Sequence, residues 1–288
     1  MIATSYTKDL IELTKPRLSS LVIFTAAGGW WLAPSQSSWQ TGVLAVTGTT
    51  ITVAAANTLN NYLERESDKH MTRTQGRSLP TGRMSPTIAL FFGLFLTIIS
   101  IPMLTLMVHP LSALLASIAL ISYVMLYTPM KRQSSFNTLM GAIPGAMPPL
   151  IGWTAATQQI DIGGLLLFAL MFLWQIPHFL AIAIYRQQEY ENAGLIMLPS
   201  EQGLDVTRRQ MLLYTFVLFP IPALLMFSKV SGWFTCIVGT ILGGWWLWQA
   251  IDGYRHKREH VWARKFFKTS LYYLTALFVV LTLDGILS

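Results

Sequence analysis

The amino-acid sequence predicts an all-α, polytopic membrane protein that forms one domain of nine transmembrane helices. Of its 288 residues, 53% are hydrophobic and 11% are charged, whereas a soluble domain carries about 25% charged residues. The apolar residues come in blocks of about 20, the length at which a helix crosses the hydrocarbon core of a bilayer. The basic residues, in turn, gather in alternate loops. These three observations together exclude an ordinary soluble enzyme.

Nine apolar segments are expected to span the membrane. They cover residues 18–34, 42–62, 88–108, 111–128, 138–157, 163–185, 211–228, 231–250 and 269–287. The fifth contains Pro144, Pro148 and Pro149, which would break a soluble helix but are tolerated where neighbouring helices satisfy the freed backbone groups. We interpret it as an ordinary, kinked span; the alternative is a broken helix that lines a cavity.

The distribution of Lys and Arg predicts the orientation of these spans. Nineteen of the 20 lie in the N-terminal segment 1–17 and in the loops 63–87, 129–137, 186–210 and 251–268, and the remaining one is Lys229. Because positively charged loops stay in the cytoplasm, we expect a cytoplasmic N-terminus and a C-terminus on the opposite side. The net charge of +7 is then a signal of topology, and we expect no nucleic-acid partner.

The end of the second predicted span carries a polar face. Its residues Asn57, Asn61, Glu64 and Asp68 are spaced by four, three and four positions. Such spacings place side chains on one face of a helix. Carboxylate and amide oxygens suit Mg²⁺, which binds one or two carboxylates together with substrate phosphate. Asn57 and Asn60 also interrupt an apolar run, where polar side chains are usually functional or packed against other helices.

A group of basic residues follows this polar face. Arg73, Arg77 and Arg83 come directly after it, and Arg65 lies within it. Guanidinium groups match phosphate oxygens in geometry. The combination predicts a site for a diphosphate and its metal ion; the alternative is a solvated loop with interfacial ion pairs. Lys131 and Arg132, at the end of the fourth span, either add to this anion site or only anchor the loop in the cytoplasm.

A second polar group closes the sixth span. His178 lies about two turns before its end and shares a helix face with Tyr185 and Glu189, seven and four positions apart. Arg186 and Tyr190 lie beside this face. Three interpretations of His178 stand side by side: a hydrogen bond to a neighbouring helix, an axial ligand of haem iron, or an acid–base group.

Five motifs together resemble the intramembrane prenyltransferases and, more narrowly, the protoheme IX farnesyltransferase family. The motifs occupy residues 60–68, 73–80, 127–132, 145–152 and 174–179. The resemblance runs from about residue 14 to residue 265, which is most of the chain. Each motif alone is a weak signal, but five in this order are specific.

The resemblance implies nine helices around a central cavity that opens to the cytoplasmic side of a bacterial-type inner membrane. It implies farnesyl diphosphate and haem b as substrates, a product with the hydroxyethylfarnesyl side chain of haem O, and a haem A synthase or terminal oxidase as partner. It also assigns Mg²⁺ and diphosphate binding to Asn60, Asn61, Glu64 and Asp68, the last three of them as metal ligands. His178 would position the haem or act near its vinyl group.

This sequence departs from the motif of the wider superfamily at two positions. Asn61 and Glu64 stand where aspartates are usual. Enzymes of quinone synthesis carry a second Asp-rich motif after the sixth span, and here that place holds His178, Arg186 and Glu189. This difference favours haem over an aromatic quinone precursor as the prenyl acceptor. A haem or lipid transporter without chemistry is the other alternative.

Overall fold

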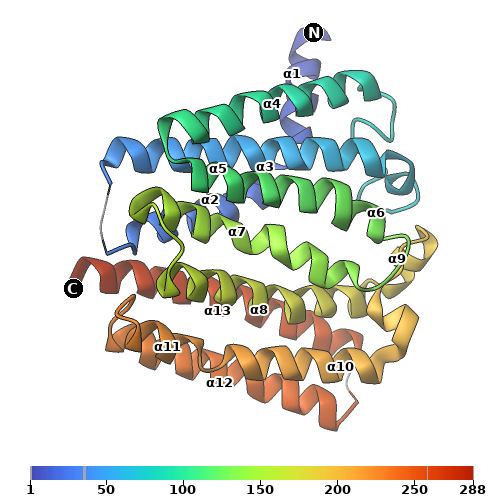
Figure 1. Ribbon diagram of the computed structural model, residues 1–288. Coiled ribbons are helices and arrows are strands. Elements are labelled where there is room, and N and C mark those ends of the chain that lie inside the picture. Colours follow the sequence, from blue (N-terminus) through green and yellow to red (C-terminus); the bar gives the residue numbers. More distant parts are fainter. Residues whose placement is uncertain (1, 35–36, 258, 288) are drawn as a thin grey trace.

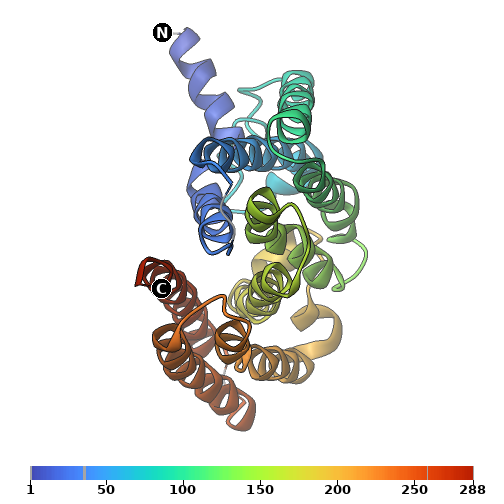
Figure 2. The same cartoon turned by 60° about the vertical axis from the view of Figure 1, so that its left-hand side comes forward.

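The structure is a computed structural model that describes residues 2–34, 37–257 and 259–287. Figure 1 shows long helices lying side by side, with the N-terminal helix projecting from the top of the view. Figure 2, turned by 60°, shows the successive helices following an arc. Arg258, one of the basic residues of the last predicted loop, lies outside the described residues, as does the side chain of Arg17.

Every predicted span coincides with a helix or with consecutive helices. The helices are α1 (Ile2–Leu13), α2 (Pro16–Trp31), α3 (Trp39–Asp68), α4 (Pro86–Met107), α5 (Pro110–Ile121), the π-helix η1 (Ser122–Tyr127), α6 (Thr128–Met130), α7 (Asn137–Thr157), α8 (Ile162–Tyr185), α9 (Gln187–Asn192), α10 (Leu198–Leu218), α11 (Ile221–Phe227), α12 (Trp233–Arg255) and α13 (His260–Leu287). The all-helical prediction is therefore confirmed for the described residues.

Seven helical stretches in the described part of the chain are long and apolar enough to cross a membrane. They are Trp39–Asp68, Pro86–Met107, Pro110–Met130, Ile162–Tyr185, Leu198–Phe227, Trp233–Arg255 and His260–Gly285. The multi-pass prediction is confirmed, whereas the count of nine also needs α2, which has only 16 residues, and α7. Helix α7 is uninterrupted although it contains three prolines, which agrees with the interpretation of the fifth segment as an ordinary helix.

The structure corrects the boundaries of two predicted loops. Helix α3 continues to Asp68, so that the predicted polar face lies entirely on a helix and the loop begins after residue 68, not at residue 63. The predicted loop 186–210 contains α9 and the start of α10, and Gly203 interrupts α10 with a φ of 84°. Glycine adopts such a positive φ without the steric cost of a Cβ atom. Because α3 extends to Asp68, the polar face that it carries is held on a helix and not on a loop.

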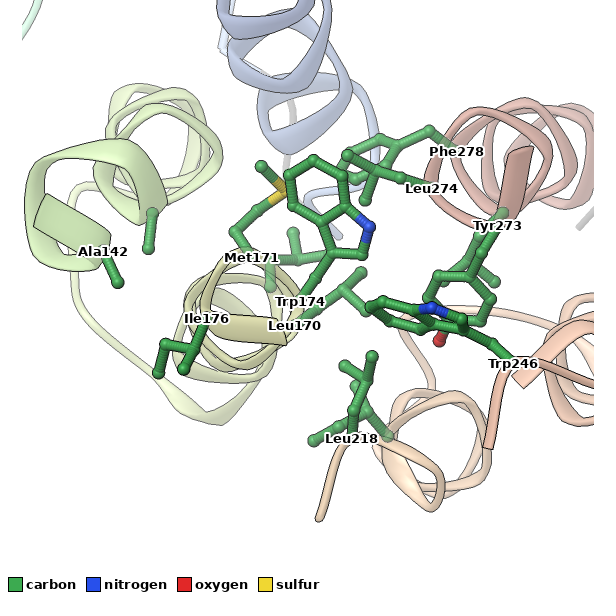
Figure 3. Packing of buried hydrophobic residues seen from close by; sticks show 14 of the residues in the cluster. Ala142, Leu170, Met171, Trp174, Ile176, Leu218, Trp246, Tyr273, Leu274 and Phe278 are labelled. Atoms are coloured by element: carbon green, nitrogen blue, oxygen red, sulfur yellow. The ribbon is translucent and has the colours of Figure 1, made fainter. Parts of the chain in front are cut away.

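Helix α8 lies at the centre of the hydrophobic core. It packs against α7, α10 and α13, and Figure 3 shows its side chains meeting those of α12 and α13. The residues labelled there are Ala142, Leu170, Met171, Trp174, Ile176, Leu218, Trp246, Tyr273, Leu274 and Phe278. This packing fixes the position of the second polar group, which α8 carries.

The long connections gather at one end of the helices. In Figure 1 the segment after α3, helix α6 and helix α9 all lie at the same end, whereas short turns join the helices at the other. A backbone hydrogen bond of 2.7 Å from Ile196 N to Lys131 O ties two of these connections together. Both polar groups predicted from the sequence consequently lie at one end of the molecule.

Candidate active site

A cavity of about 800 Å³ lies between the helices, lined by α2, α3, α5, η1, α7, α8 and α13 and by the adjoining connections. This volume falls within the range of sites that enclose small-molecule ligands. Both predicted polar groups reach it. The predicted site residues among its lining are Asn57, Asn60, Glu64, Asp68, Arg73, Arg77, Lys131, His178, Tyr185, Arg186 and Tyr190. Two polar groups from separate parts of the sequence thus meet in one cavity.

The polar face of α3 differs from the predicted one at a single position. Asn60, rather than Asn61, lines the cavity together with Glu64 and Asp68. The spacings of four between these three residues satisfy the rule for a shared helix face as well as the predicted set did. Asn60 is buried, and its Nδ2 donates a 3.0 Å hydrogen bond to Thr128 Oγ1. The amide oxygen of Asn60 is consequently held toward the cavity side.

Asn61 instead joins α3 to the N-terminal segment. Its Nδ2 donates to Leu13 O at 2.9 Å, and its Oδ1 accepts from Arg77 Nη1 at 3.3 Å. Asn61 therefore does not share the cavity lining as expected, whereas its role as a metal ligand stays a prediction. Both ends of its amide are already used inside the protein.

Three basic side chains contact this polar face of α3, and two of them pair with its carboxylates. Lys131 Nζ lies 2.6 Å from Glu64 Oε1, and Arg77 Nη1 lies 2.8 Å from Asp68 Oδ2. Burial lowers the pKa of Lys131, but the Glu64 carboxylate, Tyr127 and Tyr123 together raise it by more, so that this pKa lies well above its ordinary value. Lys131 is thus a permanent charge that takes part in the site, which goes beyond the role of a topological anchor.

Lys15 is the third cation, and the sequence analysis did not identify it as a site residue. Its Nζ donates a 2.7 Å hydrogen bond to Asn60 Oδ1, and it lines the cavity. Its backbone is left-handed, with a φ of 52°, a conformation that costs a non-glycine residue about 1–2 kcal/mol. The turn is held by Asn57 Nδ2, which donates to Thr14 O at 3.1 Å. In the sequence, only Pro16 indicates this turn, because the residue before a proline is disfavoured in the right-handed helical region.

The donor set fits Mg²⁺ only in part. Asp68 Oδ1 is buried and, within the described part of the chain, has no hydrogen-bond partner. Such an orphaned carboxylate oxygen fits a metal ion or a ligand proton donor. Among the described residues, no three His, Cys, Asp or Glu side chains are grouped so that they could together hold a metal ion. The chain therefore offers two carboxylates, Glu64 and Asp68, which suits an ion that keeps several waters and binds substrate phosphate.

Two of the five predicted diphosphate-binding residues point elsewhere. Arg65 places its guanidinium 4.6 Å from the centre of the Tyr62 ring and donates to Tyr62 O. Arg132 donates to Ser67 Oγ. Neither belongs to the cavity lining, which leaves Arg73, Arg77 and Lys131 from that set.

The π-helix η1 directs aromatic rings into the cavity. Tyr123 and Tyr127, whose ring centres are 5.3 Å apart, both line it. Lys131 Nζ lies 4.4 Å from the centre of the Tyr127 ring. Short π-helical segments are frequent at functional sites. Here the segment places two aromatic rings in the cavity lining, and one of them contacts Lys131, the cation that pairs with Glu64.

The second polar group lies in the cavity lining with the exception of Glu189. His178 is buried and lines the cavity, and its Nδ1 lies 2.7 Å from Ser270 Oγ on α13. The predicted hydrogen bond to a neighbouring helix is therefore present. Glu189 is not part of the lining: it accepts from Arg186 Nη1 at 2.6 Å and from Arg73 N at 3.4 Å. It thereby joins the connection after α3 to the connection after α8.

Comparison with known proteins shows the family to which the chain is related. The UbiA prenyltransferase family matches residues 21–272. A protoheme IX farnesyltransferase of Myxococcus xanthus is 48% identical over 96% of this chain and 95% of its own length. The protoheme IX farnesyltransferase 1 of Bacillus subtilis is 37% identical over 96% of this chain and 90% of its own length.

Solved structures share the fold at low sequence identity. A structure concerned with digeranylgeranylglyceryl phosphate synthase has a TM-score of 0.84 at 15% identity, covering 98% of this chain and 99% of that chain. A UbiA homologue from Archaeoglobus fulgidus bound to DMAPP and Mg²⁺ has a TM-score of 0.70 at 15% identity, covering 95% of this chain and 99% of that chain. The helical arrangement around the cavity is thus one that known proteins also adopt.

Proposed function

Because the chain belongs to the UbiA prenyltransferase family, we propose that it transfers a farnesyl group from farnesyl diphosphate to a vinyl group of haem b. The product would carry the hydroxyethylfarnesyl side chain of haem O. The names of the relatives at 37–48% identity support this choice of substrates. The observation in the structure that carries the proposal is the meeting of an Arg–Lys–carboxylate face and a buried histidine in one cavity.

The cations of the cavity form the proposed diphosphate subsite. Arg73, Arg77 and Lys131 reach the lining, together with Lys15. Their charges stabilise the negative charge that develops as the C1–O bond of the farnesyl group breaks and its electron pair leaves with the diphosphate. Glu64 and Asp68 are the residues that would hold Mg²⁺, which would add Lewis-acid stabilisation of the same leaving group. The solved UbiA homologues with Mg²⁺ and a prenyl diphosphate support this role.

The aromatic residues and His178 act on the other side of the reaction. The allylic cation left behind is favoured by the electron-rich faces of Tyr123 and Tyr127. A haem vinyl carbon bonds to C1, water adds to the resulting carbocation, and the added water loses a proton to leave the hydroxyl group. His178 orients the haem from the α8 wall of the cavity. An apolar lining restricts water until this last step.

We further propose nine transmembrane helices with the N-terminus and the long connections in the cytoplasm. The seven stretches identified by length and hydropathy, together with α2 and α7, give this number. The basic residues of the long connections support the orientation, because positive loops remain on the cytoplasmic side. The diphosphate would then enter from the cytoplasm, and a haem A synthase or terminal oxidase would receive the product in the bacterial inner membrane.

A competition assay tests the proposed function against prenylation of an aromatic quinone precursor. Purified protein in liposomes receives Mg²⁺, farnesyl diphosphate and equal amounts of haem b and 4-hydroxybenzoate, and products are identified by mass spectrometry. We expect farnesylated, hydrated haem and unchanged 4-hydroxybenzoate. Prenylated 4-hydroxybenzoate in place of the haem product refutes the choice of acceptor, and unchanged farnesyl diphosphate refutes the enzyme.

A further inference from the structure

Ser270 on α13 holds two aromatic side chains of α8. Its Oγ lies 2.7 Å from His178 Nδ1, and its carbonyl oxygen accepts a 2.8 Å hydrogen bond from Trp174 Nε1. Trp174 in turn stacks on the imidazole of His178, with 4.4 Å between ring centres. Figure 3 shows Trp174 reaching from α8 toward α13. Ser270 is fully buried and lies outside the sequence motifs, so that only the structure reveals these contacts.

The hydroxyl hydrogen of Ser270 determines the protonation of the imidazole. Ser270 Oγ lies 2.6 Å from the carbonyl oxygen of Phe267. Two oxygens at this distance need a hydrogen between them, and a carbonyl oxygen has none to offer. The serine therefore donates its single hydrogen to Phe267 and has only its lone pairs left for His178. It follows that Nδ1 of His178 carries the proton and donates it to Ser270.

The other ring nitrogen, Nε2, then has a free lone pair in the neutral imidazole. It lies on the side of the ring away from Nδ1, and His178 lines the cavity. The rings of Phe179 and Phe267 flank the imidazole at 5.4 Å and 4.7 Å between centres. Apolar rings offer Nε2 no hydrogen-bond donor. This arrangement presents a ligand lone pair in an otherwise aromatic part of the site.

We infer that Ser270 is a positioning residue that fixes His178 in the Nδ1–H tautomer, so that Nε2 binds the iron of the haem substrate. The inference rests on the proposed function, because it takes haem b as the substrate. The opposite tautomer would direct an N–H group into the cavity, and an N–H group does not bind iron. A hydrogen bond from the second nitrogen also fixes the ring orientation and raises its basicity as a ligand, and loss of such partners typically costs 10–100-fold in metal affinity.

The test uses purified full-length protein in lipid nanodiscs with added haem b. Haem affinity is measured by titration of the Soret band, and resonance Raman spectra of the ferrous complex report the iron–histidine stretch. We expect this stretch in the wild type and its loss in His178→Ala. Ser270→Ala should bind haem at least about 10-fold more weakly, with a shifted iron–histidine band. Ser270→Thr, which keeps the hydroxyl, should retain the wild-type haem affinity and the wild-type position of the iron–histidine band.

Two further variants keep the test decisive. Ser270→Cys has nearly the same volume but a weak acceptor, and it should show an intermediate loss of affinity if the alanine variant does not fold. Ser112→Ala removes another fully buried serine hydroxyl, which contacts Thr154 at 2.9 Å and is not part of the cavity lining. It should leave affinity and band unchanged.

Wild-type affinity and an unshifted band in both Ser270→Ala and Ser270→Cys would overturn the inference, as would an equal loss in Ser112→Ala. Absence of an iron–histidine band in the wild type would overturn its premise that His178 binds iron. Conversion of haem b in the same preparation is measured separately. A preparation that forms no product but shows the Ser270-dependent band therefore contradicts the proposed function and not the inference.

Discussion

Individual residues of the cavity carry charge in a pattern that no single motif contains. Lys15 comes from the turn before α2, Glu64 and Asp68 from α3, and Lys131 from the connection after α6. Lys131 pairs with Glu64 at 2.6 Å, whereas the hydrogen-bond partner of Lys15 is the neutral amide of Asn60 at 2.7 Å. Among the side chains that the structure describes, Lys15, unlike Lys131 and Arg77, therefore has no carboxylate within ion-pair distance, so that its charge gains from an incoming anion.

Diphosphate binding should depend on pH through Lys15. Burial lowers the pKa of Lys15 to about 7, against the raising effect of Glu64. Above this pH the empty site holds a neutral amine, and a bound diphosphate restores its charge by proton uptake. Affinity for a non-hydrolysable farnesyl diphosphate analogue should therefore fall by up to about tenfold per pH unit above pH 7. Isothermal titration between pH 6.5 and 8.5 measures this loss.

Lys15→Arg is the matched control, because arginine stays charged over this pH range. The ligand's own titration contributes equally to both proteins, so that only the difference between their slopes reports on Lys15. The other charged groups around it, Glu64, Arg77, Lys131 and Asp68, are unchanged in the variant. Equal slopes in the two proteins would show that Lys15 does not take up the proton.

Residue spacing predicted much of the site but not its details. Spacings of three and four placed Glu64 and Asp68 on one face correctly, yet both asparagines satisfied the same rule, and only the contact of Asn61 with Leu13 O decided between them. Lys15 and Ser270 act through contacts 45 and 92 positions away along the chain. Such contacts follow from helix packing, which local sequence patterns do not determine.

At the scale of elements, close helix contacts set the width of the cavity. A Cβ atom on Gly152 of α7 would lie 2.0 Å from Ala26 O of α2, and one on Gly29 would lie 2.0 Å from Pro149 O. These are backbone atoms, which no side-chain rotation can move away. Helices α2 and α7 both contribute residues to the lining, so that their separation affects the site directly.

Gly152→Ala should force α2 away from α7 and destabilise the protein by about 1–3 kcal/mol, the usual cost of overpacking. The Tm in detergent should be lower; it is measured from the amount of protein that size-exclusion chromatography recovers after heating to successive temperatures. Gly244→Ala on α12 is the control, since its Cβ would meet the Phe219 ring at an ordinary 3.6 Å. Alanine is favoured over glycine inside a helix, so that the Tm of the control should stay equal or rise. An unchanged Tm in Gly152→Ala would contradict this account of the contact.

For the whole molecule, the central feature is the collection of all long connections at one end (Figure 1). The sequence predicted this from the alternation of basic loops, because the positive-inside rule is a property of the entire chain. It predicted the helical class from the blocks of about 20 apolar residues, which recur along the entire chain. Helix ends were less well predicted: α3 extends six residues beyond the expected boundary, since polar residues that line a cavity look like a loop in the sequence.

Cysteine labelling tests the orientation. In a Cys236→Ser background, single cysteines replace the exposed residues Gln188, within α9, and Gln159, between α7 and α8. A membrane-impermeant maleimide should label Gln159→Cys in spheroplasts and Gln188→Cys only after lysis. The reverse pattern would invert the proposed orientation and move the mouth of the site to the other side of the membrane.

The most direct test of the proposed transfer is the mass of haem extracted from bacterial cells that make haem b but lack this activity. Cells that express the wild-type chain should contain haem whose mass has increased by one farnesyl group and one hydroxyl group. Asp68→Asn, present in the membrane at an equal amount, should reduce this product at least about tenfold, because it removes one of the two carboxylates proposed to hold the metal and the partner of Arg77. Unmodified haem b alone in cells with the wild-type protein would contradict the account.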